Sequence, residues 1–161
     1  MSNNQDIIKE NLKKAIYLAR NLEQSVSNIE EKRKLLYVSP EQTGRLNIQI
    51  DHRSSFYSLG VMLFQLFTQQ YPFSHTDDMQ LIYSHIAIEA PNITAVDNTL
   101  PMMLANVIAK LLNKNVEDRY QTLNAILYDL ELILENSNKI FTNDQDSLRC
   151  RITCGSHCSV F

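Results

Sequence analysis

The stretch LLYVSPEQTGR, residues 35–45, decides how this sequence folds. It lies between a charged segment, residues 27–34, and a long apolar run that begins near residue 54. Pro40 and Gly44, one of only three glycines in the chain, favour an extended or turning connection over a continuous helix. The flanking segments must therefore supply the elements to which this connection is fixed.

The composition is that of one soluble globular domain, with 161 residues of which 44% are hydrophobic and 20% charged. The net charge is −3 and the basic residues are scattered, so nucleic acid is not expected as a partner. The longest apolar stretch, residues 59–67, is far shorter than the roughly 20 residues that span a bilayer. The N-terminus lacks the apolar core of a secretory signal, and we expect a cytoplasmic protein.

Apolar residues recur at helical spacing in five parts of the chain, which are residues 5–23, 54–68, 77–89, 101–114 and 121–136. The second of these is apolar on almost all sides, which is typical of a buried helix. Residues 27–34 are expected to form a linker or a frayed helix end, and residues 92–101 a loop. Alternating apolar patterns are nearly missing, so the sequence predicts a mostly α fold of about five helices.

Three motifs in order carry a resemblance to a known family: YVSPEQTGR from residue 37, DHRSSFYSLGVMLFQLFTQQYPF from residue 51 and LLNKNVEDRYQT from residue 111. Together they resemble the end of the activation segment and the C-terminal helical lobe of eukaryotic-type protein kinases. The pattern is most similar to the Ser/Thr-kinase-like domain of large hybrid histidine kinases. The resemblance covers residues 34–135 and implies a kinase-like helical lobe without the small sheet lobe. Residues 1–33 are then an amphipathic helix with a charged linker, and residues 136–161 a flexible tail that contains the cysteines.

The resemblance also implies a structural ion pair. In the family, the glutamate of the Ser-Pro-Glu motif pairs with an arginine just before the last helix, and Glu41 and Arg119 stand at these positions. A guanidinium can hold a carboxylate with two hydrogen bonds, and so tie a loop to a distant helix junction. The alternative is two solvated surface charges. The sequence departs from the family at Ser55, where an aspartate is usual, and at Gln69, where a glycine is common.

The groups that catalyse phosphoryl transfer are missing from the sequence. Glycines at positions 44, 60 and 155 alone exclude a Gly-x-Gly-x-x-Gly loop, and no Asp-Phe-Gly occurs. The VIAK sequence at residues 107–110 mimics a strand lysine motif but lies in a helical pattern, and the four histidines are dispersed. We therefore expect no catalytic, cofactor-binding or metal-binding residue in this chain; ATP and Mg belong only to a complete family member.

The last residues carry a separate set of signals. Cys158 is the fourth residue from the C-terminus and fits a Cys-a-a-X box, so it is a candidate for prenylation. With Cys150, Cys154 and His157 it also forms a possible zinc set, although the spacing is not a standard one. The third possibility is that the tail is unselected sequence.

The leading interpretation is a catalytically inactive, incomplete kinase-like domain that acts, if at all, as an interaction module with protein partners. It is either a truncated gene product or a genuine module. One alternative is a fragment of a longer Ser/Thr kinase or hybrid sensor kinase that phosphorylates proteins with ATP when complete. Another is a lipid-anchored helical scaffold, which would associate with a membrane only if Cys158 is prenylated.

Overall fold

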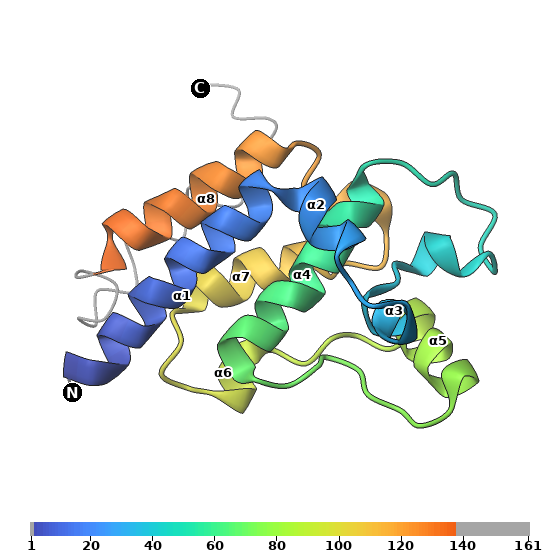
Figure 1. The fold of residues 1–161 in the computed structure, drawn as a ribbon, viewed down its shortest axis with the longest axis horizontal. Helices are drawn as coiled ribbons and strands as arrows, with labels where there is room; N and C mark the ends of the chain where they lie inside the picture. The colour runs from blue at the N-terminus through green and yellow to red at the C-terminus, as the bar shows by residue number, and fades with distance from the viewer. Residues whose placement is uncertain (1, 138–161) are drawn as a thin grey trace, which may run out of the picture.

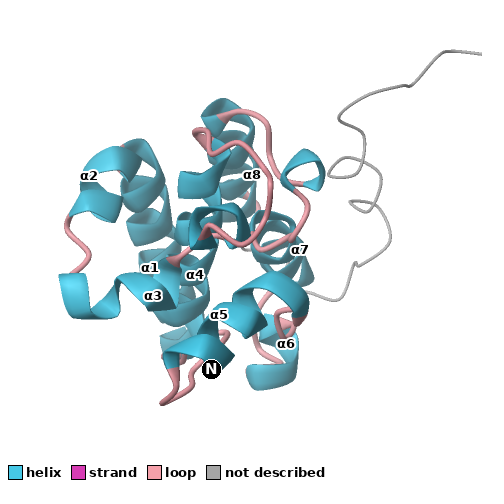
Figure 2. Ribbon diagram, turned by 90° about the vertical axis from the view of Figure 1, so that its right-hand side faces the viewer, coloured by secondary structure: helices cyan, strands magenta, loops and turns pink. Residues whose placement is uncertain are grey.

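The computed structural model describes residues 2–137, and every regular element in this part of the chain is helical (Figure 2). The long helices are α1 (Ser2–Arg20), α4 (Arg53–Thr68), α5 (Asp78–Ala87), α7 (Met102–Leu111) and α8 (Leu123–Glu135). They overlap the five segments that the apolar periodicity indicates, but the segment at residues 5–23 is divided, because α1 ends at Arg20 and residues 22–23 belong to the next helix, α2. The mostly α fold class is confirmed for residues 2–137, which contain no strand.

Six short elements complete the fold. They are the helices α2 (Leu22–Ser27), α3 (Lys34–Tyr37) and α6 (Ile93–Val96), and the 3₁₀ turns η1 (Glu31–Arg33), η2 (Pro40–Thr43) and η3 (Val116–Asp118). The sequence pattern predicts a linker or a frayed helix end over residues 27–34 and a loop over residues 92–101. Elements of four to six residues hold too few apolar positions to produce a detectable helical period, so the sequence pattern does not reveal them.

Helix α4 runs through the middle of the molecule, with α1, α2, α3, α6 and α7 packed around it (Figure 1). Its apolar side chains point in all directions because it has a neighbour on nearly every side. At Gly60 the neighbour is very close: a Cβ at this position would lie 2.8 Å from the Cβ of Leu111. The absence of a side chain at residue 60 therefore sets the close approach of α4 to α7.

Helix α1 packs against α8 and α4 and shares their core (Figure 1). The buried residues of its apolar face are Ile8, Leu12, Ala15, Ile16 and Ala19. At the surface, Nη2 of Arg20 lies 2.6 Å from a carboxylate oxygen of Glu131 in α8. The amphipathic N-terminal helix is thus part of the same hydrophobic core as the kinase-like segment.

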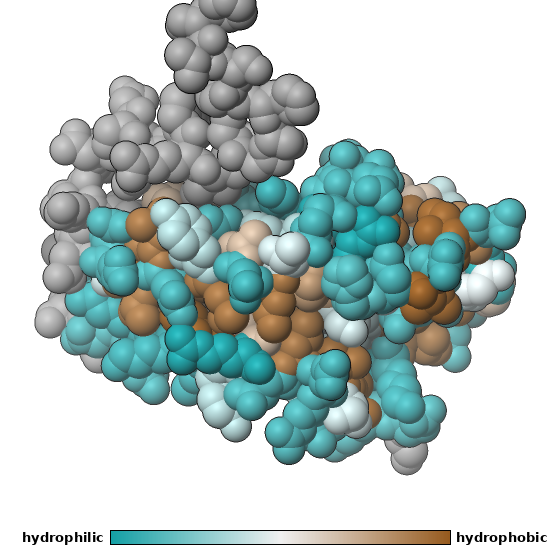
Figure 3. All heavy atoms as spheres, turned by 90° about the horizontal axis from the view of Figure 1, so that it is seen from above, coloured by the Kyte–Doolittle hydropathy of each residue, from teal (hydrophilic) through white to brown (hydrophobic). Residues whose placement is uncertain are grey.

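Residues 44–52 connect η2 to α4 without a regular helix or strand, and the loop swings outward at the end of the molecule that carries α3 and α5 (Figure 1). Ile48 and Ile50 are 45% and 55% exposed there. Figure 3 shows hydrophobic atoms at the surface of this same end, among hydrophilic ones. The loop therefore presents apolar side chains to solvent next to the segment that the sequence singles out.

Candidate functional site

The Ser-Pro-Glu motif forms a tight, internally capped turn. Pro40 starts η2 at the first helical position, where its fixed φ and missing N–H cost nothing. The Gln42 side-chain oxygen accepts hydrogen bonds from the backbone N and from Oγ of Ser39, at 3.2 and 3.0 Å. Gly44 ends the turn with φ 70, a left-handed conformation that glycine adopts without steric cost. This local geometry directs the Glu41 side chain into the protein.

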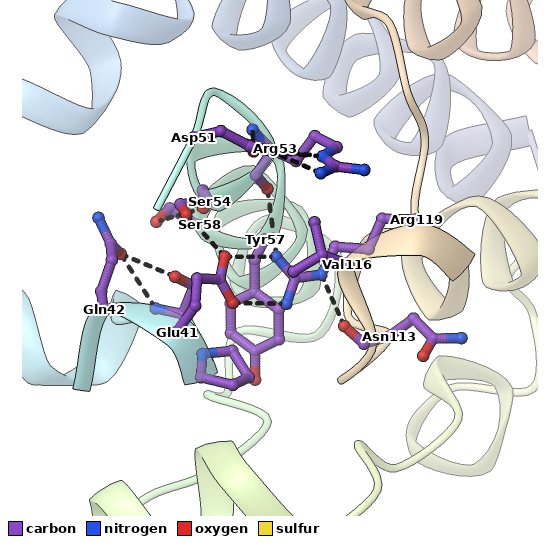
Figure 4. A network of polar contacts seen from close by, with 12 residues as sticks. Glu41, Gln42, Asp51, Arg53, Ser54, Tyr57, Ser58, Asn113, Val116 and Arg119 are labelled. Carbon is purple, nitrogen blue, oxygen red and sulfur yellow. Dashed lines mark hydrogen bonds and ion pairs between the residues drawn. The ribbon is translucent and has the colours of Figure 1, made fainter. Parts of the chain in front are cut away.

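The structure brings Glu41 and Arg119 together, 78 positions apart in the sequence (Figure 4). Nη1 and Nη2 of Arg119 donate to the two carboxylate oxygens of Glu41 at 2.8 and 2.9 Å. The Oγ of Ser54 donates a third hydrogen bond to Oε1 at 2.6 Å. The side chains of Arg119 and Glu41 are 0% and 1% exposed, so this is a buried two-pronged ion pair and not a surface contact.

Arg119 also donates to three backbone carbonyls. Its Nε donates to the carbonyl of Asn113 at 2.7 Å, its Nη1 to that of Arg53 at 3.3 Å and its Nη2 to that of Lys114 at 3.2 Å. The guanidinium lies 5.0 Å from the ring centre of Tyr57, a cation–π arrangement. One side chain therefore joins η2, the start of α4 and the connection between α7 and η3.

The hydrogen bonds decide the charge state of Glu41. Burial by itself raises the pKa of a carboxyl group, because it removes water from the charged form. The hydrogen bonds from Arg119 and Ser54, together with the positive charge of Arg119, outweigh burial and lower the pKa of Glu41 to about 2. The carboxylate is therefore ionised throughout the physiological pH range.

Next to this pair lies a second polar cluster, the Lys114 cluster, which consists of Lys114, Tyr57, Ser84 and His85 and which no sequence motif indicates. Nζ of Lys114 donates to the Tyr57 hydroxyl and to the backbone carbonyl of Ser84, both at 3.2 Å. It also lies 4.3 Å from the ring centre of Phe73. The Tyr57 hydroxyl accepts from this ammonium and also shares a hydrogen bond with Nδ1 of His85, 3.0 Å away.

His85 is fully buried, and its Nε2 has no hydrogen-bond partner within residues 2–137. Burial and the charge of Lys114 lower the pKa of His85 to about 4, with a smaller opposing effect from the backbone of Leu35. Burial and the charge of Arg119 in turn lower the pKa of Lys114 to about 8, partly offset by Glu89. The cluster holds α5 against α4 with a neutral histidine at its centre.

A third, more exposed group of contacts lies at the start of α4. Arg53 donates to Asp51 at 2.7 Å, to Glu117 at 3.0 Å and to the Gln121 side chain at 2.7 Å. The backbone N of Arg53 also donates to Oδ1 of Asp51 at 2.8 Å. These bonds fix the end of the 44–52 loop to α4 and to the segment after η3.

The remaining residues that the sequence singles out lie apart from these clusters. The VIAK lysine, Lys110, lies in α7 with its ammonium 4.4 Å from the ring centre of Tyr120. Ser55, at the family's aspartate position, makes no side-chain hydrogen bond within the described residues. No group of three or more potential metal ligands is found in that part of the chain, and none of its helices has the length and hydropathy to span a membrane. Cys150, Cys154, His157 and Cys158 lie outside the described residues.

An open groove of about 490 Å³ lies between α1, α2, α3 and α4. Its apolar floor consists of Leu18, Ile29, Met62 and Leu66, and amide, hydroxyl and charged side chains form its rim. No glycine and no lysine line the groove, so it lacks the glycine-rich backbone and the lysine that cradle a nucleotide phosphate.

The chain is similar in sequence to two kinds of kinase. It is 42% identical over 96 residues to hybrid signal transduction histidine kinase G of Dictyostelium discoideum, covering 60% of this chain and 3% of that protein. It is 32% identical over 127 residues to the peroxide stress-activated histidine kinase mak3 of Schizosaccharomyces pombe, covering 78% and 5%. It is 36% identical over 90 residues to the serine/threonine-protein kinase PksC of Streptomyces coelicolor, covering 56% and 16%. No protein-family model matches the chain.

The chain carries a protein-kinase-like helical lobe. The resemblance that the three sequence motifs indicate is thereby confirmed, and the all-helical structure of residues 2–137 agrees with it. The lobe spans about 3% to 16% of the length of these three relatives. Within it, the buried contacts of Glu41 and Arg119 fix the Ser-Pro-Glu turn to the helices, and the Lys114 cluster fixes α5.

Proposed function

We propose that this kinase-like lobe is a catalytically inactive interaction module that binds protein partners through its firmly anchored loops. The anchoring has two parts. The turn of η2 is held by the buried carboxylate of Glu41, and the far end of the 44–52 loop is held by Arg53. A loop fixed at both ends loses little conformational entropy on binding, which favours its use as a recognition surface.

The observation that carries the proposal is the short path from α2 to α3. Residues 28–33 alone join the end of α2 to the start of α3, and the Ser-Pro-Glu turn follows at once. Phosphoryl transfer needs a catalytic aspartate with its asparagine, a metal-binding aspartate and a phosphate-binding loop, all placed before that turn. The residues before Ser39 include one aspartate, Asp6 in α1, and no glycine. Since positioning and electrostatics supply nearly all of this catalysis, we expect this chain to transfer no phosphate.

The test is to incubate the purified 161-residue chain with Mg-ATP and a protein phosphoacceptor, and to record thermal unfolding with and without Mg-ATP. We expect no phosphate transfer and no shift of the melting temperature. Comparison with Glu41→Gln separates the chain from a contaminating kinase, because a contaminant's activity would not change with the variant. Phosphate transfer that falls in the variant would refute the proposal.

The second candidate function is that of a segment of a longer kinase that phosphorylates proteins with ATP. The small share of each relative that the chain covers favours it, since the two histidine kinases match over 3% and 5% of their lengths. Sequencing the transcript beyond both ends of this reading frame tests it. An in-frame lysine strand, catalytic loop and metal loop would favour the longer kinase, and stop codons on both sides would favour the module.

The third candidate is a lipid-anchored scaffold, which depends on Cys158 alone. The intact mass of the protein purified from its native cells tests it. A gain that corresponds to one isoprenyl group, with loss of the last three residues, would support anchoring. The unmodified mass would exclude it.

A further inference from the structure

The 44–52 loop carries a run of backbone groups without internal partners. Within the described residues, no hydrogen bond reaches the backbone N–H or C=O groups of residues 46–50. The loop is nonetheless fixed at both ends, by Glu41 and Arg119 on one side and by the bonds between Asp51 and Arg53 on the other. An anchored segment with free backbone groups and little secondary structure of its own is suited to pair with another extended chain.

The side chains of this segment alternate. Residues 45–51 read Arg-Leu-Asn-Ile-Gln-Ile-Asp, with apolar residues at positions 46, 48 and 50 and amides at 47 and 49. In an extended conformation this alternation places the three apolar side chains on one face. Two of them, Ile48 and Ile50, are already half exposed. The segment therefore presents an apolar face together with backbone N–H and C=O groups that have no hydrogen-bond partner within the described residues.

The sequence is also complementary to itself. When two copies run antiparallel with Ile48 opposite Ile48, Leu46 faces Ile50 and Asn47 faces Gln49. The same register sets Arg45 of one copy opposite Asp51 of the other, twice. Apolar, amide and opposite-charge pairs are the cross-strand combinations that stabilise an antiparallel ribbon. A shift of one residue would place apolar residues opposite amides, so only this register satisfies every position.

We propose that residues 45–51 bind a second copy of this chain by forming an antiparallel two-stranded ribbon about a two-fold axis at Ile48. Such a contact is self-complementary and closes as a dimer. The inference rests on the proposed role as an interaction module, and it names the partner. It stands independently of phosphate transfer, which is measured separately.

The charged ends of the segment are available for this contact. Within the described residues, the Arg45 guanidinium donates only to the thioether of Met79, 3.0 Å from Nη2, and a thioether is a weak acceptor. Asp51 accepts four hydrogen bonds from the backbone N, Nε and Nη2 of Arg53, but its side chain is 32% exposed, so its negative charge still faces solvent and can attract the Arg45 guanidinium of a second copy. Met79 and Tyr83 of α5 are exposed and extend the apolar surface on the Arg45 side.

The expected association is weak, because a two-stranded ribbon alone is marginal in water. We expect a dissociation constant between about 10 µM and 1 mM, measured by sedimentation equilibrium of the full chain. A protein that stays monomeric up to about 1 mM would overturn the proposal and leave the absence of phosphate transfer unaffected.

Disulfide trapping tests the register. In a variant with Cys150→Ser, Cys154→Ser and Cys158→Ser, we would introduce Ile48→Cys, or Asn47→Cys as the matched control. Opposed residues of an antiparallel pair have Cα atoms about 4.5–5.5 Å apart, within disulfide range. We expect mild oxidation to cross-link the Ile48→Cys protein at least about tenfold faster than the Asn47→Cys protein. Equal rates would overturn the antiparallel register, since a parallel pair opposes residue 47 to itself as well.

A charge exchange tests the pairing without cysteine. Arg45→Glu sets glutamate opposite Asp51, and Asp51→Lys sets lysine opposite Arg45, so each variant alone should dimerise at least about tenfold more weakly. In the mixture, the heterodimer regains both attractive pairs and should form at least about tenfold more tightly than either variant binds itself, even though Asp51→Lys also removes the bonds that fix the loop end to Arg53. Far-UV circular dichroism checks that each variant folds. Failure of the mixture to associate, with both variants folded, would refute the contact between Arg45 and Asp51.

Discussion

At the scale of single residues, Ser54 is the neutral partner of the buried ion pair. Its hydroxyl donates to the charged Glu41 at 2.6 Å, and a hydrogen bond to a charged group contributes about 1.5–3 kcal/mol. We expect Ser54→Ala to lower the free energy of unfolding by that amount in urea titrations. The adjacent Ser55→Ala is the control and should change it by less than about 0.5 kcal/mol. Equal effects of the two substitutions would show that the Ser54 hydrogen bond contributes little.

Two buried residues make the stability depend on pH. The pKa of His85 is lowered from 6.5 to about 4, so the unfolded chain takes up this proton first and stability falls between pH 6.5 and 4. The pKa of Glu41 is lowered from 4.5 to about 2, so its contribution is complete above pH 4.5 and is lost as the pH falls toward 2. In His85→Gln, we expect the loss in free energy of unfolding between pH 6.5 and 4 to be smaller by roughly 3 kcal/mol. The further loss as the pH falls toward 2, which Glu41 causes, should stay the same.

The measurement is the free energy of unfolding in urea at pH values from 7.5 down to the acid transition. His75→Gln is the matched control, since it replaces a histidine that α5 also contacts, through Ser84, but which is solvent-exposed. A profile of the His85 variant that runs parallel to that of the unmodified chain would contradict the assigned role of His85.

Single residues also show where sequence reasoning ends. Glu41 and Arg119 are identifiable because each lies in a motif with a fixed place in the chain order. His85 and Lys114 lie in no motif, and Lys114 has the appearance of a cation at a helix end. Their contacts with Tyr57 span 28 and 57 positions, and only the packing of three separate segments creates them.

At the scale of elements, α4 ends in a conformation that its sequence does not favour. Gln69 follows the helix with φ 58, in the left-handed region that glycine adopts without cost. A residue with a Cβ is strained there by roughly 1 kcal/mol. We expect Gln69→Gly to raise the free energy of unfolding by about 0.5–1 kcal/mol, measured by urea titration, although it also removes the bond from the Gln69 amide to the Leu66 carbonyl.

The matched control is Gln70→Gly. Gln70 is the exposed neighbour of Gln69 and has no positive φ. Glycine at position 70 should therefore not raise the free energy of unfolding, because it only adds conformational freedom to the unfolded chain. If both substitutions destabilise equally, the left-handed strain at position 69 does not limit the stability of the lobe.

The five long helices were predictable because each repeats its apolar side chains through several turns. In the structure, Asp77 and Thr122 cap the starts of α5 and α8, since each side chain accepts a hydrogen bond from the backbone N three residues on. The short helices α2, α3 and α6 form where they pack against other helices. Their sequences are too short to show an apolar period, so neither their presence nor their bounds can be predicted from them.

At the scale of the whole molecule, α1 holds the lobe together along α8 and α4. Leu12 is 0% exposed at this contact, and a leucine in such a position contributes about 2–5 kcal/mol relative to alanine. We expect Leu12→Ala to lower the free energy of unfolding by this amount and to keep a single unfolding transition by circular dichroism and hydrogen exchange. Tyr17→Ala, at a position that is 66% exposed on the same helix, should cost less than about 0.5 kcal/mol. Independent unfolding of α1 would contradict a shared core.

The amphipathic pattern of residues 5–23 predicts a helix with one buried face, but it does not say which surface that face covers. The structure shows that α8, more than a hundred positions away, supplies much of this surface. Chain order likewise does not reveal that Arg119 lies over the ring of Tyr57 while Lys114 donates to the hydroxyl of the same residue. These arrangements follow from helix packing and not from local sequence.

The central claim is that Glu41 and Arg119 act as one buried unit that fixes the Ser-Pro-Glu turn to the lobe. A double-mutant cycle tests it most directly, with the free energies of unfolding of the unmodified chain, Glu41→Gln, Arg119→Met and the double variant. Each single change leaves a buried group uncompensated and should cost about 3–5 kcal/mol, while the double change should cost much less than the sum. We expect a coupling energy of at least about 2 kcal/mol. Additive effects, with a coupling below about 0.5 kcal/mol, would contradict the claim.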